Sequence, residues 1–565
     1  MVCGEQVLAE PAKIRPAVRL VIWFAMLSAW LIQALAARHN LDADGVSYLD
    51  IAHSCLRGDW HALINGYWSP GYPLLLVAWL KLLHPSLFRE ILAVRMLGVI
   101  TLLFALISFE FSLRTFLRFR RTITANNEGA ISDHAVCAIG YALFFWTTVF
   151  MVPASLDQPD ILVFTLYLLA VSVGMELTSG HLQWPRFMAF GLILGLAYAA
   201  KAVMFPLAFL SLASLIFYKD VRKLWPRLLL ALAVFAVTCA PFVLLLSQSK
   251  KRLTFGDAGL VNYWHVIDET DEYAGSVNHP LPRIQAAPHL ANYASIIHLG
   301  TYPPWADPSY GYSGVHHHFN LRRQLNRTHI VLRAYFGIFV IQLGGLLCGF
   351  LVLIYWTNDL KGFVRRCARL VALWAPAIAG LCLYALVRVE DRFLPGFVIA
   401  LFFVTVQALR LDSAYAGLKN VRAVVFAVTV LLLATIVVQV GHLGLQVPHN
   451  SFPDWDVVVA LRQMGINEGE RVSYMGYALT DHSWAHLART PIAAEIPVED
   501  RETFWAADQS EKLKALQELA ASGAQVLITR DVPSVATLMD WKKIGENNYY
   551  VLDLRKSVGL SPTPH

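Results

Sequence analysis

Apolar segments recur along this chain, and many of them are about as long as a helix that crosses a lipid bilayer. A bilayer core takes about 20 apolar residues per helix and tolerates few charges. The chain is 56% apolar and 15% charged, whereas soluble domains carry about 25% charged residues. The sequence therefore predicts a mostly α-helical, polytopic membrane bundle.

About eleven segments fit a span of this kind. They cover residues 17–37, 92–114, 134–153, 159–178, 187–201, 203–218, 226–247, 331–356, 369–387, 393–410 and 421–444. The pair at 187–218 is short and interrupted by Lys201 and Pro206, so these helices need not cross fully. Residues 70–83 are too few to span, which favours an interfacial or re-entrant helix.

Lys and Arg residues gather in alternate connections, and such an excess is typical of cytoplasmic loops. The clusters lie at residues 13–19, 114–121, 219–227, 361–369 and 410–422. Only the cluster at 250–252 falls on the other side. The pattern predicts a cytoplasmic N-terminus and explains the net charge of +6 without a nucleic-acid partner. The outer face then receives a first loop (38–91), a short loop (155–160), a long loop (248–330) and the tail (445–565).

The tail differs in composition from the rest of the chain. Its short apolar runs at 471–475, 490–496, 525–529 and 549–554 indicate strands, and 454–464 and 510–522 indicate amphipathic helices. We therefore expect a transmembrane domain over 1–444 and a small soluble α/β domain over 445–565, on the outer face.

Three carboxylates, Asp42, Asp44 and Asp50, follow the first apolar segment. The residues after Asp44 fit a helix lying on the membrane, with Val46, Leu49, His53 and Leu56 on one face and Asp44, Tyr48 and Ile51 on another. Solvated carboxylates and a helix cap would explain each Asp alone, but that explanation is weaker for the combination.

Further charged residues stand at the ends of apolar segments. Asp160 begins one segment, where the helix dipole alone would favour it. Lys201 lies among apolar residues, which marks a functional site unless the side chain reaches the interface. Arg388 and Arg392 lie in a short outer loop against the charge bias, where they could pair with Glu390 and Asp391 or bind a phosphate.

Other candidate features carry less weight. The long loop is rich in Tyr and Trp, which suit either sugar stacking or the membrane interface. Three consecutive histidines, His316 to His318, cannot all face one ion on regular structure. The seven cysteines form no CxxC pair and are expected as small core residues. No convincing metal-ligand set is visible.

In this order, these residues resemble the GT-C superfamily of membrane glycosyltransferases. The branch with the bacterial lipid A aminoarabinose transferases and protein O-mannosyltransferases is the nearer likeness. The matching segments are Asp44–Tyr48, Ile51–His53, Gly58–Trp60, Ser69–Pro73, Pro159–Leu162, Gly195–Lys201 and Arg392–Pro395, within residues 17–410. Gly45 replaces the second acid of the family motif, and Ser69 and Gly71 alter its proline pattern.

The resemblance implies an inverting transferase in the bacterial inner membrane. It would move a sugar from a polyprenyl-phosphate donor to a lipid, glycan or protein acceptor at the periplasmic face. Asp44 alone has the Tyr48 and Ile51–Ala52 context of the family motif, so it would be the general base, with Asp160 sharing that role or positioning the acceptor. Asp42 and Asp50 are then expected as solvated or capping carboxylates. Arg392, Lys201 and Arg388 would bind the donor phosphate, and Trp68, Tyr72, Tyr48 and His53 would contact substrate. No nucleotide site is needed, since the donor is a lipid, and no cofactor is assigned, although a divalent cation could supply part of the positive charge.

Two other classes of protein remain open from the sequence. A transporter would also place charged residues near a membrane, but they should lie near the midplane of paired repeats, and no internal repeat is visible. A non-catalytic protein of envelope assembly could use the tail as a binding module, which would leave the charged residues without a role.

Overall fold

The computed structural model describes residues 15–123, 129–218, 221–268, 288–311, 319–412, 417–449, 451–530, 532–533 and 540–557. The histidines at 316–318 lie outside these ranges. The chain divides into two compact units, each built from three separate stretches of sequence. The first unit takes residues 1–36, 95–241 and 321–448, and the second takes 37–94, 242–320 and 449–565.

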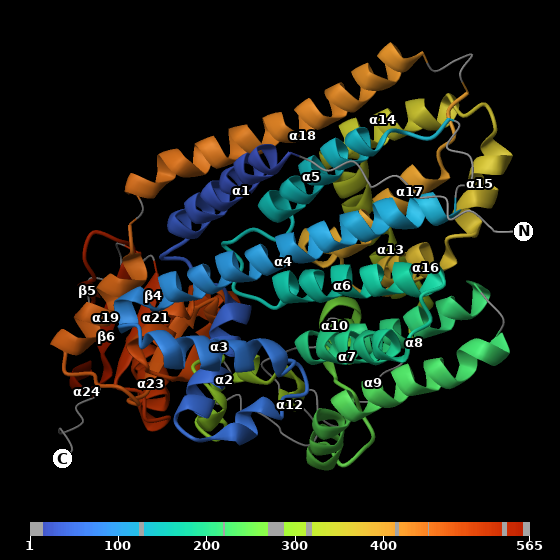
Figure 1. Ribbon diagram of the computed structural model, residues 1–565. Coiled ribbons are helices and arrows are strands. Elements are labelled where there is room, and N and C mark those ends of the chain that lie inside the picture. The colour runs from blue at the N-terminus through green and yellow to red at the C-terminus, as the bar shows by residue number, and fades with distance from the viewer. Residues whose placement is uncertain are drawn as a thin grey trace, which may run out of the picture. The chain divides into compact units, whose positions relative to one another are not determined.

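The first unit is a bundle of apolar helices. Six helices in the described part of the chain are long and apolar enough to cross a membrane. They are α1 (Pro16–Ala36), α4 (Leu87–Ile123), α5 (Asp133–Phe150), α6 (Asp160–Thr178), α9 (Val221–Ser249) and α18 (Leu418–Gln446). Helices α1 and α18, which are about 380 residues apart in the sequence, pack side by side (Figure 1).

The remaining apolar segments of this unit are broken or short. Helices α13 (Leu321–Phe336) and α14 (Gly344–Tyr355), joined through a π-helical turn, form a pair bent by 76°. Helices α15 (Leu360–Ala368) and α16 (Val371–Ala385) are bent by 87°. The shorter apolar helices are α7 (Trp184–Ala200), α8 (Met204–Ser214) and α17 (Pro395–Ala408). By length and composition the described residues offer six to eight spans, so the expected number of about eleven is not confirmed.

The second unit contains a six-stranded sheet of order β1-β3-β2-β4-β6-β5. Its strands are β1 (Ala291–Asn292), β2 (Val472–Gly476), β3 (Ile492–Pro497), β4 (Val526–Arg530), β5 (Lys542–Lys543) and β6 (Tyr549–Asp553). The central strands β3, β2 and β4 are parallel and buried, and the outer pairings are antiparallel. All four predicted strands are confirmed.

Helices complete the α/β part of this unit. Both predicted helices are present, as α19 (Pro453–Gln463) and α23 (Gln509–Ala521). The shorter helices are α20 (Ala478–Asp481), α21 (Ser483–Ala488), α22 (Arg501–Ala506) and α24 (Leu554–Ser557). Strand β1 comes from the long loop, and its Ala291 lies opposite Glu495 of β3. The sheet is therefore completed by a segment about 200 residues away in sequence, which local sequence patterns do not reveal.

The first loop supplies two helices to the second unit, α2 (Ala43–Leu56) and α3 (Gly71–Leu83). Asp42 caps α2, since its carboxylate accepts a hydrogen bond from Gly45 N at 2.7 Å. Helix α2 differs from the expected amphipathic surface helix because residues of both predicted faces, such as Leu49 and Tyr48, are buried. The reason is its packing against α3, α21 and the short α11 (Pro303–Ala306). Helix α3 has 13 residues, in line with the prediction that it is too short to span.

Candidate functional site

Two of the predicted phosphate-binding residues meet Asp160 in the first unit. Asp160 opens α6, while Lys201 follows the last residue of α7 in extended backbone. The Lys201 Nζ atom lies 2.5 Å from Oδ1 of Asp160, and Nη1 of Arg392 lies 3.9 Å from Oδ2. Asp160 is almost fully buried, so the ionised carboxylate requires these opposite charges.

Arg388 is linked to this cluster through Glu390. Its Nε atom pairs with Oε1 of Glu390 at 2.5 Å, and Oε2 of the same carboxylate accepts from Nε of Arg392 at 2.5 Å. The local pairing considered from the sequence therefore occurs for both arginines. Arg392 additionally reaches Asp160, whereas the Arg388 side chain is half-exposed.

Phe393 forms an aromatic surface beneath both cations. The Lys201 Nζ atom lies 3.9 Å from the Phe393 ring centroid, and the Arg392 guanidinium carbon lies 5.2 Å from it. The ring is itself stacked on Tyr384 at 4.5 Å. Cation–π contacts of this kind hold Lys201 and Arg392 in place without neutralising their charge.

A cavity of about 20 Å³ opens beside Asp160, with Tyr167, Arg392 and Phe393 among its lining residues. No described residue donates a hydrogen bond to Asp160 Oδ2, and the Tyr167 hydroxyl also has no hydrogen-bond partner among the described residues. Buried polar atoms normally find partners. A space of this size beside two polar oxygens suits one water molecule or a similarly small polar group.

Asp44 lies among aromatic side chains in the second unit. Its Oδ1 atom accepts a hydrogen bond from Nε1 of Trp305 at 3.2 Å, and the Trp305 carbonyl accepts one from Nε1 of Trp68 at 3.1 Å. Tyr48 packs edge-on against Trp68 and Tyr72, with ring centroids 4.9 and 5.2 Å apart. The structure thus gathers Asp44 and three of the four predicted substrate-contacting residues at one place.

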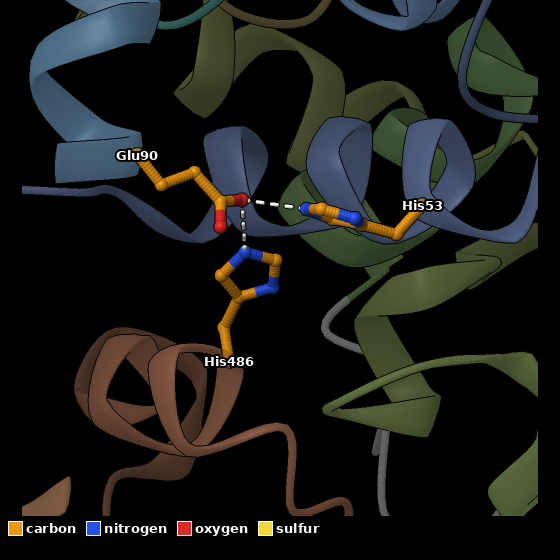
Figure 2. Close-up of side chains that lie close together, drawn as sticks. All are labelled: His53, Glu90 and His486. Carbon is orange, nitrogen blue, oxygen red and sulfur yellow. Dashed lines mark hydrogen bonds and ion pairs between the residues drawn. The ribbon is translucent and has the colours of Figure 1, made fainter. Parts of the chain in front are cut away.

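The fourth predicted substrate residue, His53, belongs to a different cluster. Its Nε2 atom lies 2.6 Å from Oε1 of Glu90, and Nε2 of His486 lies 3.3 Å from the same oxygen. Figure 2 shows both rings directed at the Glu90 carboxylate from α2 and α21. Arg489 also pairs with Glu90, through Oε2. The ligand atoms of His53, Glu90 and His486 all lie within 4.8 Å of one another, so these three residues could hold a metal ion.

Asp50 pairs with the other ring nitrogen of His486. Its Oδ1 atom pairs with Nδ1 of His486 at 2.8 Å, and its carboxylate accepts hydrogen bonds from Thr301 N at 2.6 Å and Thr301 Oγ1 at 2.9 Å. Burial raises the pKa of Asp50, but the bonds to His486 and Thr301 outweigh it and hold that pKa below its usual value. Burial and Arg489 lower the pKa of His486, but its bonds to Asp50 and Glu90 raise it above its usual value.

Sequence reasoning missed most of this second cluster. Glu90, His486 and Arg489 were not candidates, and Asp50 was assigned to solvation. One signal was present: Glu90 lies in the first turn of a long apolar helix, where a carboxylate needs a partner. The partner itself lies about 400 residues away in the tail, and no spacing rule connects the two segments.

Comparisons with known proteins give a fold and no sequence family. No protein-family model matches the chain, and no curated protein matches it either. Among solved structures, ArnT from Cupriavidus metallidurans bound to undecaprenyl phosphate aligns with a TM-score of 0.56 at 13% identity, over 97% of this chain and 100% of that one. The apo state of ArnT aligns with a TM-score of 0.53 at 14% identity, over 97% and 99% of the two chains.

A more distant likeness is to the oligosaccharyltransferase AglB from Archaeoglobus fulgidus, with a TM-score of 0.44 at 12% identity over 90% of this chain and 69% of that one. The likeness to ArnT shows that the chain has the ArnT fold over nearly its whole length. This agrees with the resemblance to the GT-C superfamily that the sequence motifs carry.

Proposed function

We propose that this protein is an integral-membrane, inverting glycosyltransferase. It would take a sugar, a hexose or a pentose, from a polyprenyl-phosphate donor and attach it to a lipid, glycan or protein acceptor at the outer face of the bacterial inner membrane. The observation that carries the proposal is the cluster of Lys201, Arg392 and Asp160, formed at the ends of apolar helices in a GT-C fold.

The leaving group of such a reaction is a lipid phosphate, which gains negative charge as the bond to the sugar breaks. Lys201 and Arg392 supply two fixed positive charges beside an apolar helical surface, which suits a phosphate carried on a polyprenyl chain. Asp160 holds both cations in place, and its oxygen in the small cavity is available to a polar group of substrate. Arg388 would act through Glu390 on the orientation of Arg392.

The acceptor hydroxyl must lose a proton as it attacks. We assign Asp44 as the general base, because it is a half-buried carboxylate with an indole donor on one oxygen and an aromatic surface around it. The acceptor oxygen forms a bond to the anomeric carbon while the bond from that carbon to the phosphate oxygen breaks. Asp44 receives the proton, the phosphate oxygen keeps the electron pair, and the configuration inverts. Trp68, Tyr48 and Tyr72 are buried against one another, so they would support the wall of the acceptor site beside Asp44.

The test separates donor binding from transfer. Full-length protein in lipid nanodiscs is titrated with undecaprenyl phosphate, and binding is followed by native mass spectrometry. Loss of one charge-assisted contact is worth about 1.5–3 kcal/mol, so Lys201→Ala and Arg392→Ala should each weaken binding by roughly ten- to a hundredfold. Arg365→Ala, at an exposed position of α15, serves as the matched control.

Transfer is then measured with a panel of polyprenyl-phosphate sugars and extracted envelope lipids as acceptors. Equal binding of undecaprenyl phosphate by the native protein and the Lys201→Ala, Arg392→Ala double variant would remove the basis of the proposal. Transfer by the native protein with loss in both single variants would support it.

A further inference from the structure

The cluster around Glu90 is built like a metal site. His53 on α2, Glu90 on α4 and His486 on α21 present two imidazole nitrogens and one carboxylate oxygen to a common point. All three residues belong to the second unit. Two histidines and a glutamate form a donor set that Zn²⁺ prefers, with a further position open to water or another ligand.

The surroundings of His486 add an independent observation. A histidine that binds a metal through one ring nitrogen almost always donates the other N–H to a carboxylate, a backbone carbonyl or water. Here Nδ1 of His486 lies 2.8 Å from Asp50, and Asp50 is held by the main chain and hydroxyl of Thr301. Gly300 permits this approach, since a Cβ atom there would lie 2.7 Å from Oδ2 of Asp50. The Nε2 atom of His486 is thereby directed at Glu90 and His53.

A positive charge already occupies the point where these groups converge. Nη1 of Arg489 lies 3.0 Å from Nε2 of His486, Nη2 lies 2.9 Å from Nε2 of His53, and the same guanidinium pairs with Glu90. The site is therefore shaped for a cation. Arg489 ends α21 in left-handed backbone, with φ of 55°, and its side chain is 18% exposed. It can leave the site without disturbing a helix.

We propose that His53, Glu90 and His486 form a Zn²⁺ site in which Arg489 is the competing, displaceable cation. The metal would tie α2, which carries Asp44, to α4 and to the tail helix α21. This site does not depend on the proposed transfer reaction, and its role would be to fix the position of α2 within the second unit.

The experiment measures zinc binding by the full-length protein, purified without an affinity tag and dialysed against chelator. Zn²⁺ is titrated by isothermal calorimetry, and bound metal is counted by mass spectrometry. The native protein should bind one tight equivalent. His53→Ala and His486→Ala should each remove it, whereas His61→Ala, at an exposed histidine of the same loop, should not. A triple His316→Asn, His317→Asn, His318→Asn variant should retain it.

The decisive variant is Arg489→Met. If the guanidinium competes with the metal, its removal should tighten zinc binding by about tenfold or more. Asp50→Asn should weaken it by about 10–100-fold, as measured for other supports of metal-binding histidines. Co²⁺ in place of Zn²⁺ should give visible absorption bands that disappear in His486→Ala. No tight zinc in the native protein and in Arg489→Met would overturn the proposal, and so would unchanged binding in the two histidine variants.

Discussion

The Nζ atom of Lys201 lies 2.5 Å from Oδ1 of Asp160, so two residues chosen separately from the sequence form one ion pair between the end of α7 and the start of α6. The Asp160 carboxylate is buried, whereas the Lys201 side chain is 22% exposed. Lys201 is therefore the more accessible partner of the pair, while Asp160 cannot lose its partners without a large penalty.

Breaking this ion pair from one side should destabilise the protein. Lys201→Met leaves a buried carboxylate short of a partner, and the expected loss in the free energy of unfolding is about 3 kcal/mol. Lys201→Met combined with Asp160→Asn should recover most of that loss, because no unpaired charge remains. Binding of undecaprenyl phosphate should stay weak in both. Thermal unfolding in detergent measures the first effect, and additive losses in the double variant would contradict the coupling.

Asp44→Asn should abolish sugar transfer and leave donor binding unchanged. The amide keeps the shape of the side chain but cannot take a proton, and loss of a general base lowers rates by about 10²–10⁴-fold. Undecaprenyl phosphate should bind as in the native protein. Asp42→Asn is the matched control, since asparagine caps a helix as well as aspartate does. Transfer at the native rate in Asp44→Asn would refute the assignment of the base.

His482 should make stability depend on pH. It is fully buried in the tail beside Tyr302, and burial lowers the pKa of its imidazole to about 4. Its pKa in the unfolded chain is about 6.5, so the unfolded state binds one more proton as pH falls from 6.5 to 4. The contribution to the free energy of unfolding is therefore complete above pH 6.5 and declines by roughly 3 kcal/mol toward pH 4.

His482→Gln should flatten that decline, because glutamine does not titrate and can still donate to the Ala478 carbonyl, which Nδ1 contacts at 2.8 Å. Melting temperatures across pH 4.5 to pH 7.5 measure the difference between the two proteins. His61→Gln, at an exposed histidine, should leave the native pH dependence in place. The same slope in the native protein and His482→Gln would show that His482 is not the group responsible.

Gly191→Ala should separate two helices of the first unit. A Cβ atom at Gly191 would lie 2.2 Å from the carbonyl oxygen of Ala231, so α7 and α9 cannot keep their present distance. Overpacking of this kind usually lowers stability by about 1–3 kcal/mol. Gly174→Ala, in the apolar helix α6, meets no atom within 4 Å and should be neutral or stabilising. Equal melting temperatures for both variants would argue against a close helix crossing at Gly191.

The sequence predicted which segments are apolar, but it did not predict how many of them form unbroken helices that cross the membrane. The six long helices follow from length and hydropathy, and all were among the predicted segments. The segments at 331–356 and 369–387 are apolar enough to cross a membrane. In the structure, however, the helices at 321–342 and 344–355 meet at a bend of 76°, and those at 360–368 and 371–385 meet at a bend of 87°. Hydropathy reports only how apolar a segment is. It does not report where tertiary packing bends a helix. The break between α7 and α8 at Lys201, in contrast, was predicted from the charge in the sequence.

The sequence by itself determined the membrane class, the long helices, the strands of the tail and the charged candidates Asp44, Asp160, Lys201 and Arg392. These follow from local periodicity, from the charge pattern and from motif resemblance, each of which acts over a few residues. Only the tertiary structure decided that Lys201 and Arg392 share Asp160, that β1 completes the tail sheet, and that His53 meets Glu90 and His486. Such partners are chosen by the packing of distant segments, and the need to neutralise a buried charge does not specify which segment supplies the neighbour.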